Sequence, residues 1–314
     1  MKPKRVVVAI NPSASFGSTR DVGPAVVQTL RALGHEVTSL TEPDFDSLIA
    51  SARAAIRSKP DALVVVGGDG MVNLGTNLLV GSKVPLGIVP SGTGNDMARG
   101  LGIPIDNTEA AIDQLAEALQ REPRVIDAAR VSWTVADGTK AERWFACALS
   151  AGFDSIVNER ANLMHHPKGP SRYIIALLAE LARLKPRHYR VELDGKVVET
   201  DALLVSLGNN VSIGGGMKIT PDAVLDDGLL DVMIVKPLSR IAFLRIFPRV
   251  FKGEHTTDPR VLMQRARRIR IEAPDIVAYG DGERFAPLPI DVEVVPGALR
   301  ILDQGGSRTD AAAG

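Results

Sequence analysis

Two glycine-rich segments have the residue types and the spacing of a phosphate-binding site. The first, Gly67-Gly68-Asp69-Gly70, follows an apolar run at residues 64–66 and leads into a helical pattern at residues 71–80. Glycine permits a tight turn, and the free N–H groups and positive dipole end of a following helix attract an anion. Asp69 could also approach a metal ion held by the phosphates. The alternative is an ordinary turn between two elements, since Asp-Gly pairs are common in turns.

The second segment, Pro90-Ser91-Gly92-Thr93-Gly94-Asn95-Asp96, follows an apolar run at residues 86–89. The third, Asn11-Pro12-Ser13-Ala14-Ser15, follows the run of residues 6–10. Because the carboxyl ends of parallel strands meet at one edge of a sheet, we expect all three segments to converge on one polyanion. The hydroxyl of Thr93 and the amide of Asn95 suit phosphate or ribose, whereas Asp96 as a helix cap is the structural alternative.

The chain lacks the two commonest nucleotide motifs. It contains no G-x-x-x-x-G-K-[ST] segment and no G-x-G-x-x-G after a strand, which disfavours a P-loop and a dinucleotide fingerprint. Phosphate binding is therefore predicted to depend mainly on backbone donors at residues 67–70 and 92–94.

The elements that must position these segments alternate between strand and helix. Strands are predicted at residues 6–10, 62–66 and 86–89. Helices are predicted at residues 22–33, 46–58, 71–80 and 108–120, the last of them capped by Thr108. This alternation predicts an α/β domain at residues 1–124, built on a parallel sheet with helices on both faces.

The texture of the chain changes after Pro123. Short β-like segments follow, with turn signals at Asp137-Gly138, Asp194-Gly195, Asp227-Gly228, Asp281-Gly282 and Pro296-Gly297. They predict a second domain at residues 125–295, a mostly antiparallel β-sandwich interrupted by one helix at about residues 171–184. Residues 296–304 are expected to return to the first domain, and residues 305–314 to form a disordered tail.

Composition limits the classes of partner. The 314 residues carry 37 basic and 37 acidic side chains, so no global field would attract nucleic acid. The single cysteine, Cys147, cannot form an internal disulfide, which fits a reducing compartment such as the cytoplasm. There is no signal-peptide pattern and no apolar run of the roughly 18 residues that span a bilayer. Contact with a lipid would therefore be peripheral and transient, and a homodimer is left open.

The motifs taken together resemble the diacylglycerol kinase catalytic family, which includes sphingosine and ceramide kinases. The resemblance rests on Gly67-Gly68-Asp69-Gly70 and on the run from Pro90 to Arg99, about twenty residues later. It extends to Gly152-Phe153-Asp154, Gly214-Gly215-Gly216, Asp227-Gly228-Leu229 and Asp281-Gly282-Glu283. It implies a fold akin to phosphofructokinase and NAD kinase, with ATP and Mg²⁺ as cofactors. The implied reaction phosphorylates diacylglycerol to phosphatidic acid at a membrane surface, with nucleotide and acceptor meeting between the domains.

The resemblance also implies a set of nucleotide contacts, which adds to Gly67, Gly92, Gly94 and Asn95 of the glycine-rich segments. These implied contacts are Asn11, Pro12, Ser13, Ala14, Ser15, Thr41, Gly68, Asp69, Gly70, Met71, Val72, Asn73, Leu74 and Thr93.

The resemblance implies Asp281 and Glu283 as the catalytic carboxylates. Either could accept the proton of a lipid hydroxyl as the γ-phosphoryl group arrives, and a plain surface turn is the alternative. It also implies a structural Mg²⁺ on Asp227 and the carbonyls of Val224 and Leu229. Asp226 could substitute for Asp227, and here too an ordinary turn is the alternative.

Two positions depart from the family pattern. After Gly67-Gly68-Asp69-Gly70 the family usually has Thr, and three residues later Glu, where this chain has Met71 and Leu74. A backbone cradle would survive these changes, but a contribution of that carboxylate to phosphate or metal placement would not. Alternatives are therefore a kinase for another lipid alcohol such as a sphingoid base, or a non-catalytic nucleotide or lipid sensor.

A basic stretch could bring the protein to a membrane. Residues 240–270 contain nine Lys and Arg residues against two acidic ones, a net charge of +7, interleaved with apolar side chains. Such a stretch suits an anionic lipid surface. A solvated strand face with a buried helix side is the alternative.

Overall fold

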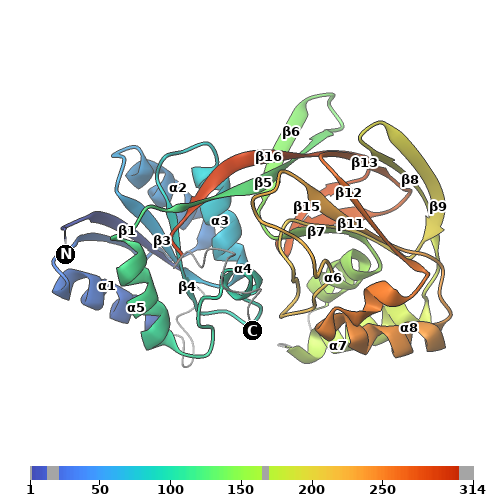
Figure 1. The fold of residues 1–314 in the computed structure, drawn as a ribbon, viewed down its shortest axis with the longest axis horizontal. Coiled ribbons are helices and arrows are strands. Elements are labelled where there is room, and N and C mark those ends of the chain that lie inside the picture. The colour runs from blue at the N-terminus through green and yellow to red at the C-terminus, as the bar shows by residue number, and fades with distance from the viewer. Residues whose placement is uncertain (1, 13–20, 165–169, 304–314) are drawn as a thin grey trace, which may run out of the picture. The chain divides into compact units, whose positions relative to one another are not determined.

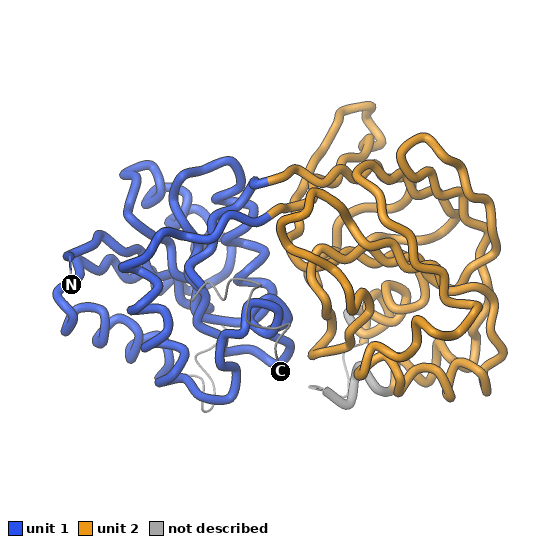
Figure 2. Tube along the Cα trace, viewed as in Figure 1, with its two compact units in different colours: residues 1–126, 297–314 blue, residues 127–296 orange. Residues whose placement is uncertain are grey.

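The computed structural model describes residues 2–12, 21–164 and 170–303. The chain divides into two compact units (Figure 2). Unit 1 contains residues 1–126 and 297–314, and unit 2 contains residues 127–296. Strands β5 and β16 each run from one unit into the other.

Unit 1 is an α/β domain with helices on both faces of a parallel sheet (Figure 1). Its strands lie in the order β2-β1-β3-β4, followed by the end of β16, which pairs with β4 in parallel. Its elements are β1 (Arg5–Ile10), α1 (Val22–Ala32), β2 (Glu36–Leu40), α2 (Phe45–Ile56), β3 (Ala62–Gly67), α3 (Asp69–Leu79), β4 (Leu86–Pro90), α4 (Asp96–Gly100) and α5 (Thr108–Ala118).

The burial of the central strand explains why the helices form two layers. All of β3 is buried. Val64 and Val66 pack in one core with Leu30 of α1 and Leu115 of α5, whereas Leu63 and Val65, which are equally buried, face the other side. Helices α2 and α3 cover that second face (Figure 1).

Helix caps define where the segments of unit 1 begin. Asp44 caps α2, because its side chain accepts the N–H of Ser47 at 2.8 Å. The prediction that Thr108 caps α5 is wrong by one residue: Asn107 is the cap, and its Oδ1 accepts the N–H of Ala110 at 3.1 Å. Both residue types are good caps, so the sequence did not separate them.

Unit 2 is a β-sandwich of two sheets. One sheet has the order β12-β11-β10-β7-β14-β15, and all of its pairs are antiparallel. The other contains β6, β5, β16, β13, β8 and β9. The strands are β5 (Arg124–Thr134), β6 (Lys140–Phe145), β7 (Ala148–Gly152), β8 (Arg187–Leu193), β9 (Lys196–Ala202), β10 (Leu204–Gly208), β11 (Leu230–Val235), β12 (Val261–Ala266), β13 (Arg268–Glu272), β14 (Val277–Gly280), β15 (Glu283–Pro287) and β16 (Ile290–Ile301).

The first sheet of unit 2 is buried on both faces. Val205 and Leu207 of β10 point into the sandwich core, where they pack with residues of the second sheet such as Ile269 and Val292. Leu204 and Ser206 alternate with them and face the helices of unit 2. These helical elements are α6 (Phe153–Leu163), α7 (Pro170–Ala182), α8 (Arg240–Ile246), η2 (Phe247–Lys252) and η3 (Glu254–Thr257).

The predicted fold class is confirmed, with two local differences. Helix α6 was not predicted, although Phe153, Ile156, Val157 and Ala161 recur at helical spacing. It follows directly on β7 at Gly152, whose φ is +151°. Pro296-Gly297 lies within β16 rather than in a turn between strands, and Gly297 has a φ of +65° there. Among the residues that the structure describes, no helix combines the length and the apolarity needed to cross a bilayer.

Candidate active site

The glycine segments of unit 1 lie together at the carboxyl ends of β3 and β4. Asp69 at the start of α3 accepts the N–H of Asp96 on its Oδ1 at 2.7 Å. Within the second segment, Asn95 accepts the N–H of Gly92 at 3.1 Å and donates to the carbonyl of the same residue at 2.8 Å. Asn95 has a φ of +53°, a conformation that Asn tolerates better than most residues. Side chains therefore fix the shape of this loop.

The first segment of the chain joins this edge. Asn11 directly follows β1, and its N–H donates to the carbonyl of Val66 on β3 at 3.1 Å. Its Cβ would lie 3.3 Å from a Cβ placed on Gly67. The predicted contacts Ser13, Ala14 and Ser15 fall outside the described residues. Thr41 follows β2 and is exposed, with its hydroxyl 3.5 Å from that of Ser39.

The side chains that follow Gly70 point into the protein. Met71, Val72 and Leu74 are all buried, and Asn73 is buried with its Oδ1 accepting from Asn77 at 3.2 Å. Contacts of these residues with a nucleotide could therefore come only from their backbone. The two departures from the family pattern, at positions 71 and 74, are thus apolar side chains in an apolar interior.

Asp281 and Glu283 stand in different surroundings at the turn between β14 and β15. Asp281 is buried, and its carboxylate accepts three backbone N–H groups: Ala146 at 3.0 Å, Cys147 at 2.9 Å and Ala148 at 3.1 Å. These three hydrogen bonds tie the turn to the start of β7. Asp281 also has a φ of +49°, so the turn is held in an uncommon conformation.

Glu283 begins β15 and is half-buried. Its side chain forms no hydrogen bond or ion pair with any residue that the structure describes. The neighbouring residues are anchored through α6, where Glu159 accepts from the hydroxyl of Tyr279 and from Nε of Arg284, the latter at 2.8 Å. These contacts fix both strands of the turn, and they do not involve the Glu283 carboxylate.

An apolar cavity of about 90 Å³ lies in unit 2, between the first sheet and the helices. Leu204 and Met233 line it from the sheet, and Leu177, Phe243 and Phe247 line it from α7, α8 and η2. Three polar side chains also reach its wall: Asp154, Ser206 and His255. A mostly apolar wall with a few polar groups is the usual composition of a small-molecule site.

The polar group at this wall is centred on Asp154, in the first turn of α6. Its Oδ2 accepts from the hydroxyl of Ser150, and that hydroxyl lies 3.1 Å from the hydroxyl of Ser206. Its Oδ1 is buried and has no hydrogen-bond partner. Burial raises the pKa of Asp154, and the hydrogen bond from Ser150 opposes this shift. A buried carboxyl with an open acceptor is suited to a hydroxyl donor.

His255 is buried in η3, and its Nε2 lies 3.2 Å from the carbonyl of Ile219. Only a protonated Nε2 can donate to that carbonyl, so the neutral ring carries its hydrogen there. The other nitrogen, Nδ1, is buried without a partner. Burial lowers the pKa of His255, and the nearby charge of Arg249 acts in the same direction.

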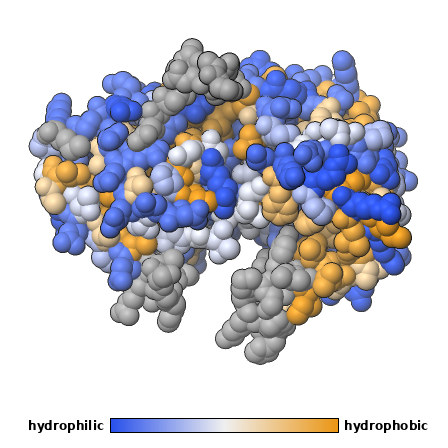
Figure 3. Space-filling model, turned by 60° about the horizontal axis from the view of Figure 1, so that its bottom comes forward, coloured by the Kyte–Doolittle hydropathy of each residue, from blue (hydrophilic) through white to orange (hydrophobic). Residues whose placement is uncertain are grey.

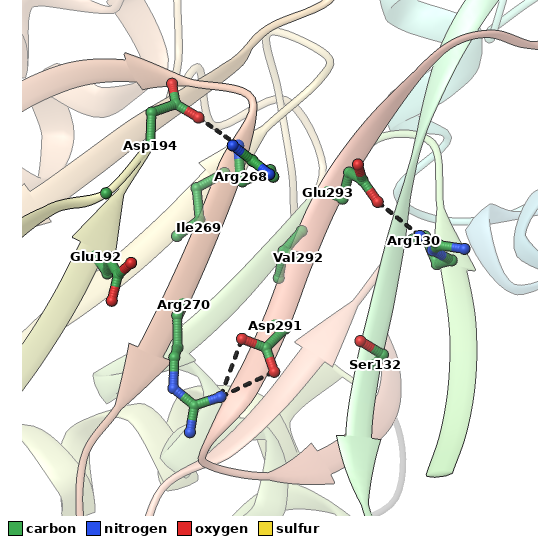
Figure 4. A pocket seen from close by; sticks show the side chains of 11 residues that line it. Arg130, Ser132, Glu192, Asp194, Arg268, Ile269, Arg270, Asp291, Val292 and Glu293 are labelled. Atoms are coloured by element: carbon green, nitrogen blue, oxygen red, sulfur yellow. Dashed lines mark hydrogen bonds and ion pairs between the residues drawn. The ribbon is translucent and has the colours of Figure 1, made fainter.

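A second depression, of about 400 Å³, lies on the outer face of the second sheet (Figure 4). Its walls are charged but largely self-neutralised. Arg130 pairs with Glu293 at 2.6 Å, and Arg270 pairs with Asp291 at 2.8 Å. Because the groups satisfy one another and the surface is open, this depression has no features of a reaction site.

At the predicted metal site, the carboxylate of Asp227 accepts hydrogen bonds from protein groups. Asp227 accepts from the guanidinium of Arg265 with one oxygen and from the N–H of Leu229 with the other, at 3.1 Å. Both oxygens thus already have donors, which fits Mg²⁺ poorly. Magnesium at Asp227, Val224 and Leu229 stays a prediction.

Sequence reasoning missed Asp154, His255 and Glu159 as site residues. Asp154 belongs to the Gly152-Phe153-Asp154 motif, so a signal for it was present. His255 and Glu159 gave none, because their positions depend on the packing of η3 and α6 against the first sheet.

Comparison with known proteins defines the class. Residues 5–131 match the sequence pattern of the diacylglycerol kinase catalytic domain, and residues 147–303 match the YegS C-terminal NAD kinase beta sandwich-like domain. A crystal structure of a diacylglycerol kinase from Bacillus anthracis superimposes with a TM-score of 0.70 at 23% identity, covering 96% of this chain and 98% of that one. An NAD kinase from Archaeoglobus fulgidus in complex with ATP gives 0.52 at 14% identity, covering 95% and 93%. The fold is therefore that of the NAD kinase-like kinases.

Sequence relatives are closer. A diacylglycerol kinase of Mycobacterium tuberculosis is 38% identical over 299 residues, covering 95% of this chain and 94% of the relative. One of Bacillus subtilis is 27% identical over 290 residues, covering 91% and 92%. This chain belongs to the diacylglycerol kinase catalytic family, as its motifs predicted, and it is a kinase.

Proposed function

We propose that the protein transfers the γ-phosphoryl group of ATP, taken up as its Mg²⁺ complex, to the free hydroxyl of diacylglycerol, giving phosphatidic acid. The apolar cavity of unit 2 is the observation that supports a lipid as the acceptor, because a water-soluble alcohol or a nucleotide would not require an apolar cavity wall. The family named above supports the phosphoryl transfer itself.

The nucleotide is assigned to the glycine segments of unit 1. The N–H groups of Gly70 in the first turn of α3 and of Thr93 and Gly94 would supply fixed donors without a side chain. The N–H of Gly92 already donates to Asn95 and helps to shape the loop. The loops are held in shape by Asp69 and Asn95, so little rearrangement is required when the phosphates bind. Preorganised donors of this kind contribute most when charge redistributes in a phosphoryl transfer.

The acceptor is assigned to the cavity lined by Phe243 and Met233. At about 90 Å³ it has room for about three water-sized groups, since each occupies roughly 30 Å³. A headgroup or the first part of an acyl chain fits this volume, and a longer chain requires α7 and α8 to separate. Asp154, with its open Oδ1, would accept a hydrogen bond from a lipid hydroxyl.

Glu283 is the group we assign as general base. Its carboxylate has no described partner, whereas the carboxylate of Asp281 is fully engaged by backbone N–H groups. Asp281 would then fix the turn that presents Glu283. Removal of the acceptor proton as the phosphoryl group arrives requires only that Glu283 lie near the hydroxyl.

The helical end of unit 2 is the surface we assign to the membrane. Large apolar side chains are exposed there: Leu178 on α7, and Ile241, Leu244 and Phe251 on α8 and η2. Figure 3 shows hydrophobic side chains gathered over this end, next to hydrophilic ones. Lys and Arg residues accompany them, namely Arg183, Lys185, Arg187, Arg240, Arg245, Arg249 and Lys252.

The structure divides the basic stretch of residues 240–270. The arginines after residue 259 belong to the sandwich, where Arg260 pairs with Asp258 at 2.9 Å and Arg270 with Asp291. The membrane surface is therefore narrower than the charge count indicated, and it ends near Lys252.

A sphingoid base is the alternative acceptor. Its ammonium would need an anionic partner near the hydroxyl. Among the described residues that line the cavity the only acidic side chain is Asp154, whose Oδ2 already accepts from Ser150. The cavity is therefore better suited to a neutral lipid alcohol such as diacylglycerol.

The test is a panel of lipid alcohols in mixed micelles with γ-labelled ATP, read by which lipid becomes labelled. Diacylglycerol should be the best acceptor, and Leu204→Trp, which fills the cavity, should slow its phosphorylation while ATP binding stays unchanged. Equal labelling of a short water-soluble diol, or unaltered lipid turnover in Leu204→Trp, would contradict the proposal.

A further inference from the structure

The turn at residues 226–229 is held to the sandwich by two arginines. Arg265 of β12 contacts the carboxylate of Asp227, and its Nε lies 3.5 Å from Oδ2 of Asp231. Asp231 stands directly opposite Arg265 in the antiparallel pairing of β11 with β12. Arg267 donates from Nε to the carbonyl of Gly228 at 3.3 Å. Two guanidinium groups thus meet one turn that is rich in carboxylates.

Two backbone N–H groups of this turn also donate hydrogen bonds to carboxylates. The N–H of Leu229 donates to Oδ1 of Asp227 at 3.1 Å, and the N–H of Gly228 donates to Oδ2 of the buried Asp127 at 2.7 Å. Asp127 follows the end of unit 1 on β5 and belongs to unit 2. The turn is therefore tied to Asp127 of β5 and to Arg265 of β12.

A divalent ion would compete with these contacts. Mg²⁺ requires oxygen ligands at close to 2.0–2.1 Å in near-octahedral geometry. Asp227 is the predicted carboxylate ligand, and both of its oxygens already accept hydrogen bonds, Oδ2 from Arg265 and Oδ1 from the N–H of Leu229. An ion placed here would also face both guanidinium charges at short range.

The buried carboxylate of Asp231 is a reason for a positive charge at this turn. It is buried, and its Oδ2 makes no hydrogen bond. The carboxylate of Asp227 shares this surrounding, and the guanidinium of Arg265 contacts both groups. Without a positive charge, these neighbouring carboxylates would repel one another across the turn.

We propose that Arg265 takes the place of the divalent cation in this chain. Its guanidinium neutralises Asp227 and Asp231 and ties the turn to β12, so the fold of unit 2 is independent of Mg²⁺. Only the Mg²⁺ that accompanies ATP is then required for activity. The inference does not depend on the identity of the lipid acceptor.

The test compares thermal unfolding of the nucleotide-free protein in millimolar Mg²⁺ and in excess EDTA. The wild type should unfold at the same temperature in both. Arg265→Gln should unfold at a clearly lower temperature in EDTA, because the carboxylates of Asp227 and Asp231 would then lack a cation. Mg²⁺ should restore part of this loss, since a ligand of the native state alone raises its stability by mass action.

Two further variants make the comparison specific. Arg265→Lys keeps the charge and should unfold close to the wild type, without a response to Mg²⁺. Arg121→Ala is the matched control, because Arg121 pairs with Glu117 at 3.5 Å on exposed α5. Loss of this exposed ion pair should change the unfolding temperature little.

Three results would overturn the proposal. The first is a wild-type unfolding temperature that rises with Mg²⁺ and loses this rise in Asp227→Asn. The second is Arg265→Gln no less stable than Arg121→Ala. The third is Arg265→Gln that Mg²⁺ fails to stabilise, since the arginine would then not stand at a cation site.

Discussion

Gly92 and Gly68 approach so closely that neither position has room for a side chain. A Cβ on Gly92 would lie 2.4 Å from Cα of Gly68 and 3.0 Å from its nitrogen, and both obstacles are backbone. The carboxyl ends of β3 and β4 are thus joined glycine to glycine. No flexible side chain can yield to relieve such a contact.

Gly92→Ala should therefore weaken ATP binding without unfolding the protein. The added methyl group pushes the two segments apart, and overpacking of this kind costs about 1–3 kcal/mol, of which about 1.4 kcal/mol corresponds to a tenfold loss of affinity. Calorimetric titration with Mg-ATP should show an affinity lower by about tenfold or more.

The control is Thr93→Ala, which removes an exposed side chain from the same segment. If the backbone binds the phosphates, this variant should lose no more than about threefold, under 1 kcal/mol. An equal loss in Thr93→Ala and Gly92→Ala would mean that side chains dominate and that the backbone cradle is wrong.

Variants of the two carboxylates in the β14–β15 turn should have different effects: Asp281 should matter for stability and Glu283 for the rate of the reaction. Asp281→Ala leaves three buried N–H groups without an acceptor, at a cost of about 1–3 kcal/mol for each. We expect a lower unfolding temperature in this variant. Glu283→Gln should unfold like the wild type and bind ATP normally, yet turn over about 10²–10⁴ times more slowly.

The measurement pairs thermal unfolding with steady-state kinetics under conditions where chemistry limits the rate. Near wild-type turnover in Glu283→Gln would exclude Glu283 as the base, and the search would move to Asp69. Unchanged stability in Asp281→Ala would show that its three hydrogen bonds do not anchor the turn.

The helical end of unit 2 should bind anionic vesicles through apolar contact as well as charge. Ile241 and Leu244 are 65% and 55% exposed on α8. The double variant Ile241→Glu with Leu244→Glu should reduce co-sedimentation with phosphatidylserine-containing vesicles by at least about tenfold, because burial of one such side chain contributes about 1.5–3 kcal/mol. High salt should weaken the remaining binding.

Val135→Glu provides the control for added negative charge, because Val135 is exposed at the turn between β5 and β6. Binding should be retained in this variant. Vesicle binding that is equally reduced by both changes, or by neither, would argue against α8 as the membrane contact.

The fold class followed from the sequence because its signals are local. Fully apolar strands such as residues 62–66, each followed by glycine and a helical period, leave few alternatives to a parallel sheet. The antiparallel sandwich was indicated in the same way by short strands between Asp-Gly turns. Helix α6 was missed although Phe153, Ile156, Val157 and Ala161 have a helical period, because it is short and follows β7 directly.

The site was less predictable because its properties depend on pairs distant in sequence. Asp281 and Glu283 look alike in a tripeptide, and only the N–H groups of residues 146–148 distinguish them. Likewise, no residue near Asp227 in the sequence indicates that Arg265 will contact it. The contact depends on the register in which β11 pairs with β12. Such cross-strand partners are fixed by topology rather than by composition.

The last prediction concerns pH and His255. Burial lowers the pKa of His255 below the ordinary value of 6.5. A proton added at Nδ1 would find no hydrogen-bond acceptor, because that nitrogen is buried without a partner. At a pH just below that value the unfolded chain binds a proton at this position and the folded protein does not. The contribution of neutral His255 is therefore present above pH 6.5 and is lost as the pH falls through and below it.

Urea unfolding should consequently give a lower midpoint at about pH 5.5 than at about pH 7.5, with the m-value unchanged. In His255→Gln the difference between the two midpoints should be smaller, because the amide can still donate to Ile219 but does not titrate. His35 is also buried, and burial lowers its pKa too, so part of the pH dependence should remain in the variant. His188→Gln is the matched control, since His188 is exposed on β8 and paired with Asp201 at 3.1 Å. Because groups common to all three proteins cancel in the comparison, a pH dependence in His255→Gln as steep as in the wild type would show that His255 is not kept neutral by its burial.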